Sequence, residues 1–573
     1  MIRHCRFSRP LAVALLALLL PAACASDNLD LDHTKDISGP TITGGESLSG
    51  NFLSGRHAQA VRDMPEAVKF LTRSIELSPD IPDLVRRAFV LLASEGRIAE
   101  AVPLARKVIK KNAVSPIASL TIIVDDFNNG RFEDAVKTIE ALPGGGLNGF
   151  MAPLLAAWSS VSQGQSATQA TVHLEPLLKD GSKPLYYLHK AMILDFKGQH
   201  DEAVKTYQDE IKEQGGVSLR VIQLLGNLFR RMGENAKAEL LYRNFSKSNP
   251  SSPIARHALK KLESGAPVTP LISSAKEGAA EGFFGIATTL SQQNASETAL
   301  IFARLGLHLR PDFPVMQILL GNILQMDDQL LSANGVYNAI DLASPYSWPA
   351  RLRAAENLDD LDRTQEAIDA LNALADEEPT LADPLTRLGD TLRAHKRFAE
   401  AVVAYDRAFE RIGTPERHHW PLLYARGIVL ERSKHWDRAE ADFLKALEFE
   451  PEQPFVLNYL GYSWVDQGKN LDEAKDMIRR AVNLRPSDGY IIDSLGWAHF
   501  RLGEFADSVK EMERAVELTP EDPVLNDHLG DAYWRVGRKT EARFQWERAL
   551  TLNPDDELRI QVEAKKVDGL PDL

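Results

Sequence analysis

The chain has 573 residues, of which 25% are charged and 44% are hydrophobic, and this composition excludes an intrinsically disordered protein. A formal net charge of -14 disfavours nucleic acid as a partner. The two cysteines, Cys5 and Cys24, are too few for a disulfide scaffold or a cysteine-rich metal site.

Residues 1–24 have the pattern of a secretory signal peptide. Arg3, Arg6 and Arg9 form a basic start without an acidic residue, and residues 11–23 form an apolar stretch. This stretch is too short for a permanent transmembrane helix, whereas its length suits a signal peptide that is removed. We therefore predict export from the cytoplasm.

The signal peptide ends in the letters PAAC, at residues 21–24, and small residues before a cysteine resemble the bacterial lipobox. The usual leucine three places before the cysteine stands four places before it here, at Leu20. The resemblance implies lipid attachment at Cys24, and the Ala25 that follows implies the outer membrane. The alternative is cleavage after Ala25, which would leave a soluble periplasmic protein.

Residues 25–47 are polar and acidic and have no helical periodicity, so we predict a flexible tether that holds the body off a membrane surface. Residues 1–23 contain three arginines and no acidic residue, so their removal would change the net charge from -14 to -17. No other stretch reaches about 18 consecutive apolar residues. Contact with the membrane is therefore expected through the N-terminal lipid only.

A spacing of 34 or 35 residues repeats through the last third of the chain. Leu-Gly pairs and single prolines both follow it, at Gly461, Gly496, Gly530, Pro451, Pro486, Pro520 and Pro554. Small residues follow these glycines at similar offsets, at Ala474, Ser508, Ala542, Ala481, Ala515 and Ala549. The pattern resembles the tetratricopeptide repeat, in which each unit is a pair of antiparallel helices.

The physical sense of this pattern is local packing. Small residues let neighbouring helices approach, glycines such as Gly468 and Gly503 close the turn between the two helices, and prolines end the second helix. Large residues such as Trp464 and Trp546 fill the remaining gaps. Because one helix pair cannot bury its apolar face alone, neighbouring pairs must stack. We predict an all-α fold, a superhelical solenoid of antiparallel helix pairs.

Further copies of the repeat extend towards the N-terminus. They are centred on Gly427, Gly389, Ala355, Gly321, Ala287, Gly226, Ala191 and Gly55. The consensus is weakest between residues 82 and 181, and we predict roughly 14 helix pairs in total.

The repeat loses phase once, because the spacing from Gly226 to Ala287 is 61 residues and includes Pro267 and Pro270. We therefore predict two arrays, and one continuous superhelix with an irregular insert is the alternative. The predicted divisions are an N-terminal degenerate array over 48–264, a linker over 265–279, a C-terminal array over 280–554, and a capping helix and tail over 555–573 that carries Lys565 and Lys566.

The first helix of each tetratricopeptide repeat lines the inner surface, and this position predicts a partner-binding groove. In the last three repeats the groove residues are Asn458, Tyr462, Tyr490, Asp493, Trp497, Phe500, Arg501, Asp531 and Trp534. Aromatic rings beside polar groups suit an extended peptide or a partner helix, although some of these rings could instead pack between repeats. The cationic clamp that binds chaperone tails is absent, because Tyr462, Val524 and His528 occupy its positions.

The sequence contains no HExxH, phosphate-binding loop or Gly-x-Ser-x-Gly motif. We therefore expect no enzymatic activity, no cofactor and no metal. Carboxylates that are distant in sequence can converge in a fold, so we keep a cell-wall enzyme as a hypothesis. It is the least favoured one, because repeat solenoids mostly offer binding surfaces.

Residues 280–554, with runs such as LNYLGYSWVDQG, DGYIIDSLGWAHFRLG and LNDHLGDAYWRVGR, resemble large proteobacterial envelope lipoproteins built from tetratricopeptide repeats. One group of these is the outer-membrane adaptor of a periplasmic carboxyl-terminal processing protease. The resemblance implies an adaptor that binds periplasmic proteins. Together with the groove, the absent motifs and the negative charge, it leads us to expect a non-enzymatic scaffold that binds proteins or extended peptides and no nucleic acid. The alternative is a scaffold for peptidoglycan synthesis or polysaccharide export.

Overall fold

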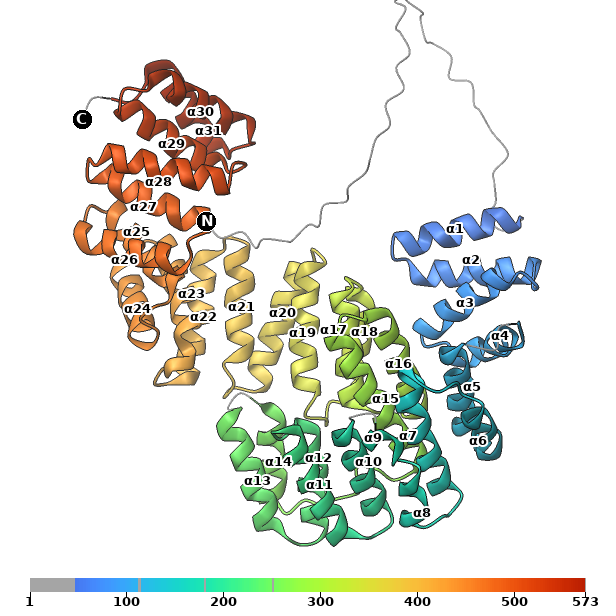
Figure 1. Ribbon diagram of the computed structural model, residues 1–573. Helices are drawn as coiled ribbons and strands as arrows, with labels where there is room; N and C mark the ends of the chain where they lie inside the picture. The colour runs from blue at the N-terminus through green and yellow to red at the C-terminus, as the bar shows by residue number, and fades with distance from the viewer. Residues whose placement is uncertain (1–46, 112–114, 180–181, 250–251, 572–573) are drawn as a thin grey trace, which may run out of the picture.

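The computed structural model describes residues 47–111, 115–179, 182–249 and 252–571 (Figure 1). These residues form 31 α-helices and one short 3-10 helix, and they contain no strand. The predicted signal peptide, Cys24 and all but the last residue of the predicted tether lie outside the described residues. No helix in the described ranges is long and apolar enough to cross a membrane.

The first part of the solenoid begins with three regular helix pairs and continues with a long helix that has two short partners. These helices are α1 (Leu48–Ala60), α2 (Met64–Leu77), α3 (Pro82–Ser94), α4 (Ile98–Lys111), α5 (Pro116–Asn128), α6 (Phe132–Glu140), α7 (Gly146–Ser162), α8 (Ala167–Val172) and α9 (Pro176–Lys179). Two further pairs and one single helix follow. They are α10 (Lys183–Phe196), α11 (His200–Gln214), α12 (Leu219–Arg231), α13 (Asn235–Ser248) and α14 (Pro253–Glu263).

The second part consists of eight pairs and a final helix. The first four pairs are α15 (Ala275–Gln292), α16 (Ser296–Leu309), α17 (Pro314–Met326), α18 (Leu330–Asn338), α19 (Ser347–Asp360), α20 (Thr364–Glu377), α21 (Asp383–Ala394) and α22 (Phe398–Ile412). After the 3-10 helix Arg417–His419 come α23 (Trp420–Arg432), α24 (Trp436–Phe449), α25 (Pro454–Asp466), α26 (Leu471–Leu484), α27 (Gly489–Arg501), α28 (Phe505–Leu518), α29 (Pro523–Arg535), α30 (Lys539–Thr551) and α31 (Asp556–Asp568).

Each pair turns between its two helices at a residue with positive φ. These residues are Arg62, Gly96, Gly130, Gly164, Gly198, Gly233, Asn294, Asp328, Asp362, Lys396, Lys434, Gly468, Gly503 and Gly537. Most steps in this series are 34 residues, and the regular spacing includes the region between 82 and 181 where the sequence consensus is weak. The described residues therefore contain fourteen pairs, which confirms the predicted superhelical solenoid of roughly 14 repeats.

The small residue of the repeat lies against a large side chain of the second helix. A methyl group on Gly321 would lie 2.2 Å from a ring carbon of Tyr337, and one on Gly427 would lie 2.5 Å from a ring carbon of Phe443. Gly530 has the same relation to Trp546. A larger residue would force the two helices apart, so the expected role of the small residues is confirmed.

The first predicted array and the beginning of the second share one hydrophobic core, because α15 and α16 pack against helices of the first part, whereas the rest of the second array forms two further core clusters. Helix α15 contacts α7 and α10, and α16 contacts α3 and α5 (Figure 1). The core extends from Ala58 to Ala354 and includes Ile272, inside the predicted linker. The linker is irregular over 265–274, whereas 275–279 are helical because α15 begins at Ala275.

A buried ion pair ties α12 to α15 at this junction. The Arg220 guanidinium bonds to both carboxylate oxygens of Glu281, with Nε at 3.0 Å from Oε2, and Arg310 lies 3.6 Å from the same carboxylate. Asn227 of α12 donates to the Thr269 carbonyl at 2.9 Å and so holds the irregular segment against α12. Helices α8 to α14 therefore lie between α7 and α15 in the chain, although α7 and α15 contact each other directly.

Candidate functional site

The nine predicted groove residues lie on the first helices of three consecutive pairs. Asn458 and Tyr462 are on α25, Asp531 and Trp534 are on α29, and the other five are on α27. Helix α27 contacts both α25 and α29, so the three helices lie side by side as the prediction requires.

An aromatic stack forms the centre of this surface, which we call the Trp497 stack after its middle ring. The Trp497 ring lies parallel to Phe500 at 4.9 Å and nearly parallel to the His528 imidazole at 4.4 Å. All three side chains are half-buried. The stack joins α27 to α29, and its rings leave part of their surface to solvent.

His528 is charged in this position because of Asp493. Its Nδ1 lies 2.8 Å from Asp493 Oδ2. Burial alone would lower the pKa of His528, but the Asp493 carboxylate, with Asp527 and Asp531 nearby, raises it to about 9. A protonated imidazole therefore rests on the Trp497 face, which is a favourable cation–π arrangement.

Helix α31 covers the last repeat and supplies its own cation to it. Lys565 Nζ lies 2.7 Å from Asp527 Oδ2 and 2.8 Å from Asp531 Oδ2. Asp531 also accepts a hydrogen bond from Trp546 Nε1 at 3.0 Å. Burial, with the neighbouring Asp527, raises the pKa of Asp531 to about 6, and Lys565 opposes that rise.

Two predicted groove carboxylates are thus buried and already paired. Asp493 is 5% exposed and meets His528, and Asp531 is 4% exposed and meets Lys565. Trp534 is half-buried and lies close to Gly569, where a methyl group would come within 2.0 Å of its ring. Asp531 and Trp534 contact α31 or the residue after it, whereas Asp493 is held by His528 of α29.

The other predicted groove residues retain exposed surface. Tyr490 is 46% exposed, and Arg501 is exposed and lies 3.5 Å from Asp466. Asn458, Tyr462, Trp497 and Phe500 are half-buried. Contact of these six residues with a partner stays a prediction.

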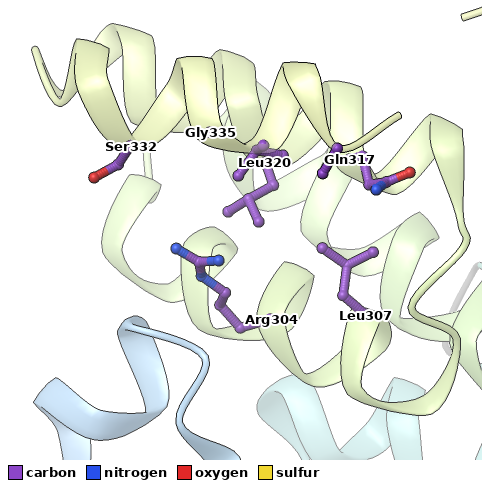
Figure 2. A pocket seen from close by; sticks show the side chains of 8 residues that line it. Arg304, Leu307, Gln317, Leu320, Ser332 and Gly335 are labelled. Carbon is purple, nitrogen blue, oxygen red and sulfur yellow. The ribbon is translucent and has the colours of Figure 1, made fainter. Parts of the chain in front are cut away.

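A cavity of about 420 Å³ lies between α16, α17 and α18, far from this groove in sequence. Figure 2 shows the Arg304 side chain rising from α16 towards Leu320 of α17 and Ser332 of α18. The lining residues are Arg304, Leu307, Gln317, Leu320, Ser332, Gly335, Val336 and Ala339. The walls are therefore largely apolar, with one cation and two neutral polar side chains.

A second cavity, of about 370 Å³, shares Arg304 and Leu307 with the first. The residues that line it come from the α3–α4 turn, α5, α15, α16 and the loop after α16: Glu95, Gly96, Asn128, Lys276, Arg304, Leu307, His308 and Pro311. It exists because α16 packs against α3 and α5. We call the two cavities together the Arg304 site.

Arg304 is held at one nitrogen only. Its Nε donates to the Ser94 carbonyl at 3.1 Å, at the C-terminal end of α3, where a cation is favoured by the helix dipole. Within the described residues Arg304 forms no ion pair, and neither does Lys276. Burial lowers the pKa of Arg304, and the nearby Glu95 carboxylate opposes that shift.

Glu95 is the one carboxylate among the residues that line the Arg304 site. Burial raises the pKa of Glu95 despite Arg304 and Arg97. Burial lowers the pKa of His308, the Asp125 carboxylate opposes that shift, and Lys276 adds to it. Two cations, Arg304 and Lys276, therefore line this site with one carboxylate, in a chain whose net charge is -14.

Sequence analysis did not identify Arg304 or Lys276. The repeat pattern marks packing positions, and both residues fall between them. They come together with Glu95 only because α15 and α16 pack against helices that precede them by more than a hundred residues. No local spacing carries that information.

One group of side chains in the described part could in principle share a metal ion. Ligand atoms of His499, Glu504 and Asp507 lie within 4.8 Å of one another. Lys475 Nζ already lies 2.8 Å from Glu504 Oε1, and His499 Nδ1 lies 2.5 Å from Oε2. Since the central carboxylate is neutralised by protein groups, we assign no metal there.

Comparison with known families identifies the repeat. Residues 494–557 and residues 185–209 each match a family described as tetratricopeptide repeat. The chain therefore carries tetratricopeptide repeats in both parts of the solenoid, and this fold is typically a non-catalytic scaffold for protein binding. A comparison with curated proteins gives no match.

Several solved structures are similar at low identity. A tetratricopeptide repeat protein from Parabacteroides merdae is 17% identical, with a TM-score of 0.37, over 44% of this chain and 99% of that one. The structure of the APC/C hetero-tetramer Cut9-Hcn1 is 13% identical, with a TM-score of 0.38, over 92% of this chain and 97% of that one. YrrB, described as a tetratricopeptide repeat protein with an unusual peptide-binding site, is 20% identical, with a TM-score of 0.27, over 34% and 98%.

Proposed function

We propose that this chain is a non-enzymatic scaffold of the bacterial cell envelope that recruits periplasmic proteins. The observation that carries the proposal is the solenoid of fourteen pairs, which exposes an aromatic surface at the Trp497 stack and an excess of positive charge at the Arg304 site. Solenoids of this kind offer extended surfaces for protein partners. The lipobox-like segment supports a lipid anchor at Cys24 in the outer membrane.

The partners we propose are a carboxyl-terminal processing protease and its substrates. The support is the resemblance of residues 280–554 to envelope lipoproteins that act as adaptors of such a protease. A scaffold for peptidoglycan synthesis or polysaccharide export is the second candidate, because the same surfaces would serve it.

Affinity capture with the full chain as bait, from a detergent-solubilised envelope fraction, tests the proposal. Recovery of the processing protease supports the adaptor, whereas recovery of synthases or export-channel subunits favours the second candidate. A double variant Tyr490→Ala and Arg501→Ala removes two exposed groups of the groove and should weaken capture if the partner binds there. Hydrolysis of a cell-wall substrate by the purified chain would contradict the non-enzymatic assignment.

The anchor is tested separately with radiolabelled palmitate. The wild-type chain should incorporate the label and remain in the membrane fraction, and Cys24→Ala should lose both properties. Labelling that persists in Cys24→Ala would show that the lipid is not on this cysteine.

A further inference from the structure

We propose that the Arg304 site binds an extended peptide segment with an internal acidic residue, whose carboxylate pairs with Arg304 and Lys276. The proposal rests on the scaffold function above and names the chemistry of one segment that the scaffold recognises. The site is formed by the junction of the two parts of the solenoid and is separate from the predicted groove on α25, α27 and α29.

The first argument is the hydrogen-bonding capacity of Arg304. Because only Nε is used, by the Ser94 carbonyl, the two terminal nitrogens are available. Figure 2 shows them directed into the first cavity, towards Leu320 and Ser332. A guanidinium fork in a partly desolvated position is suited to a carboxylate, which it can bind with two parallel hydrogen bonds.

The second argument is charge complementarity. Lys276 lines the same site, is half-buried and forms no ion pair in the described part of the chain. Most arginines near the surface of this protein are paired, as Arg97 is with Glu100 at 2.5 Å. Two cations face one carboxylate, that of Glu95, and an anion from outside would balance the excess.

The third argument concerns the shape of the site. Since two cavities meet at Arg304 and Leu307, a bound chain can pass from one to the other with Arg304 near its middle. Apolar walls from Leu320 and Val336 suit small apolar side chains, and Gln317 and Ser332 can bond to the main chain of the segment. A C-terminal carboxylate at Arg304 would fill only one cavity, so we commit to an internal Asp or Glu.

The experiment measures binding of fluorescent peptides to the full chain. The probes are peptides of about ten residues, blocked at both ends, in which a random apolar and polar sequence surrounds either Glu or Gln at the centre. A third set has Gln at the centre and a free C-terminal carboxylate. The variants are Lys276→Gln, which leaves the Arg304 bond to Ser94 intact, and Arg304→Lys, which keeps the charge and loses the fork.

Lys205→Gln is the matched control, because Lys205 is exposed on α11 and lines neither cavity. We expect Glu-centred peptides to bind about tenfold or more tightly than their Gln counterparts. Lys276→Gln and Arg304→Lys should each weaken the Glu-centred peptides by roughly threefold to tenfold and leave Gln-centred peptides unchanged. Lys205→Gln should bind as the wild type does.

Three results would overturn the proposal: equal affinity for the Glu and Gln sets, a preference for the free C-terminus, or no binding by any set. None of them would contradict the scaffold function, which depends on capture of the envelope partners. If capture fails while Glu-centred peptides bind, the proposed scaffold function is wrong, whereas peptide binding at the Arg304 site is supported.

Discussion

Gly278 of α15 lies directly against the indole ring of Trp158 of α7. A methyl group on Gly278 would come within 2.4 Å of three ring carbons. The ring is fully buried, and its Nε1 donates to His189 Nδ1 at 3.0 Å, so it has no room to move aside. This contact brings together two helices that are more than a hundred residues apart and fixes how the two parts of the solenoid join.

Substitution of Gly278 should therefore destabilise the junction. Gly278→Val must displace either α15 or the Trp158 ring, and overpacking of this kind costs about 1–3 kcal/mol or more. The measurement is the free energy of unfolding in guanidinium chloride. Gly285→Ala is the control on the same helix, because its methyl group would lie 3.7 Å from Leu185 Cδ1, an ordinary contact distance.

Gly285→Ala should be neutral or stabilise by up to about 1 kcal/mol, since alanine favours helix more than glycine. Equal effects of the two substitutions would show that α7 and α15 are not in close contact.

The buried carboxylate of Glu281 gives a second test of the junction. Glu281→Gln leaves Arg220 and Arg310 buried near each other without a counter-charge, and breaking such a pair costs about 3–5 kcal/mol. The exposed pair of Glu66 with Lys69, at 2.9 Å, is the comparison, and Glu66→Gln should cost less than about 1 kcal/mol. The measurement is the urea midpoint of each variant, and a similar small loss in both would contradict the buried ion pair between α12 and α15.

The pair of His528 and Asp493 predicts a pH-dependent stability. The pKa of His528 is about 9 in the folded chain and 6.5 for an unperturbed histidine. The pair therefore stabilises fully below about pH 6.5 and progressively less as pH rises through 9, by roughly 3 kcal/mol in total. Unfolding free energies measured across this range should fall with pH in the wild type.

His528→Gln should remove that dependence, because no proton is then bound or released by the pair. A variant that keeps the same slope between about pH 6.5 and 9 would show that another group titrates.

The sequence could predict the parts of this fold that depend on neighbouring residues. The small and large partners, such as Gly530 and Trp546, are fixed by helix packing within one pair. The glycines at 96, 130, 164 and 198 also stand 34 residues apart, and this spacing was a usable sign of regular pairs in the weak region. The turns at Asp328 and Lys434 could not be predicted in this way, because the residue with positive φ is not a glycine there.

Contacts between distant segments could not be predicted in the same way. Helix α15 belongs to the second array by its sequence, and its packing against α7 depends on where the irregular segment returns the chain. For the candidate groove, the positions on the first helices were predicted, whereas the pairing of Asp531 with Lys565 was not. A polar cap was expected from Lys565, but its insertion beside two carboxylates is a tertiary contact.

Removal of the Lys565 charge should therefore destabilise the end of the solenoid, and the effect should depend on pH. Lys565→Met leaves Asp527 and Asp531 buried one helical turn apart without their cation, which costs about 3 kcal/mol or more while Asp531 is ionised. The pKa of Asp531 is about 6, raised by burial and by Asp527, and without Lys565 it rises further. At about pH 5 Asp531 takes up a proton, so the loss should be smaller there than at about pH 8.

Lys566→Met is the matched control for this experiment. Lys566 pairs with Glu547 at the surface, where an ion pair is worth less than about 1 kcal/mol. Denaturant midpoints at the two pH values should therefore separate Lys565→Met from both the wild type and Lys566→Met, and the separation should be wider at the higher pH. If the two lysine variants behave alike, α31 does not hold Lys565 between the two carboxylates. Asp531 and Trp534 would then be accessible to a partner in the groove, as the sequence predicts.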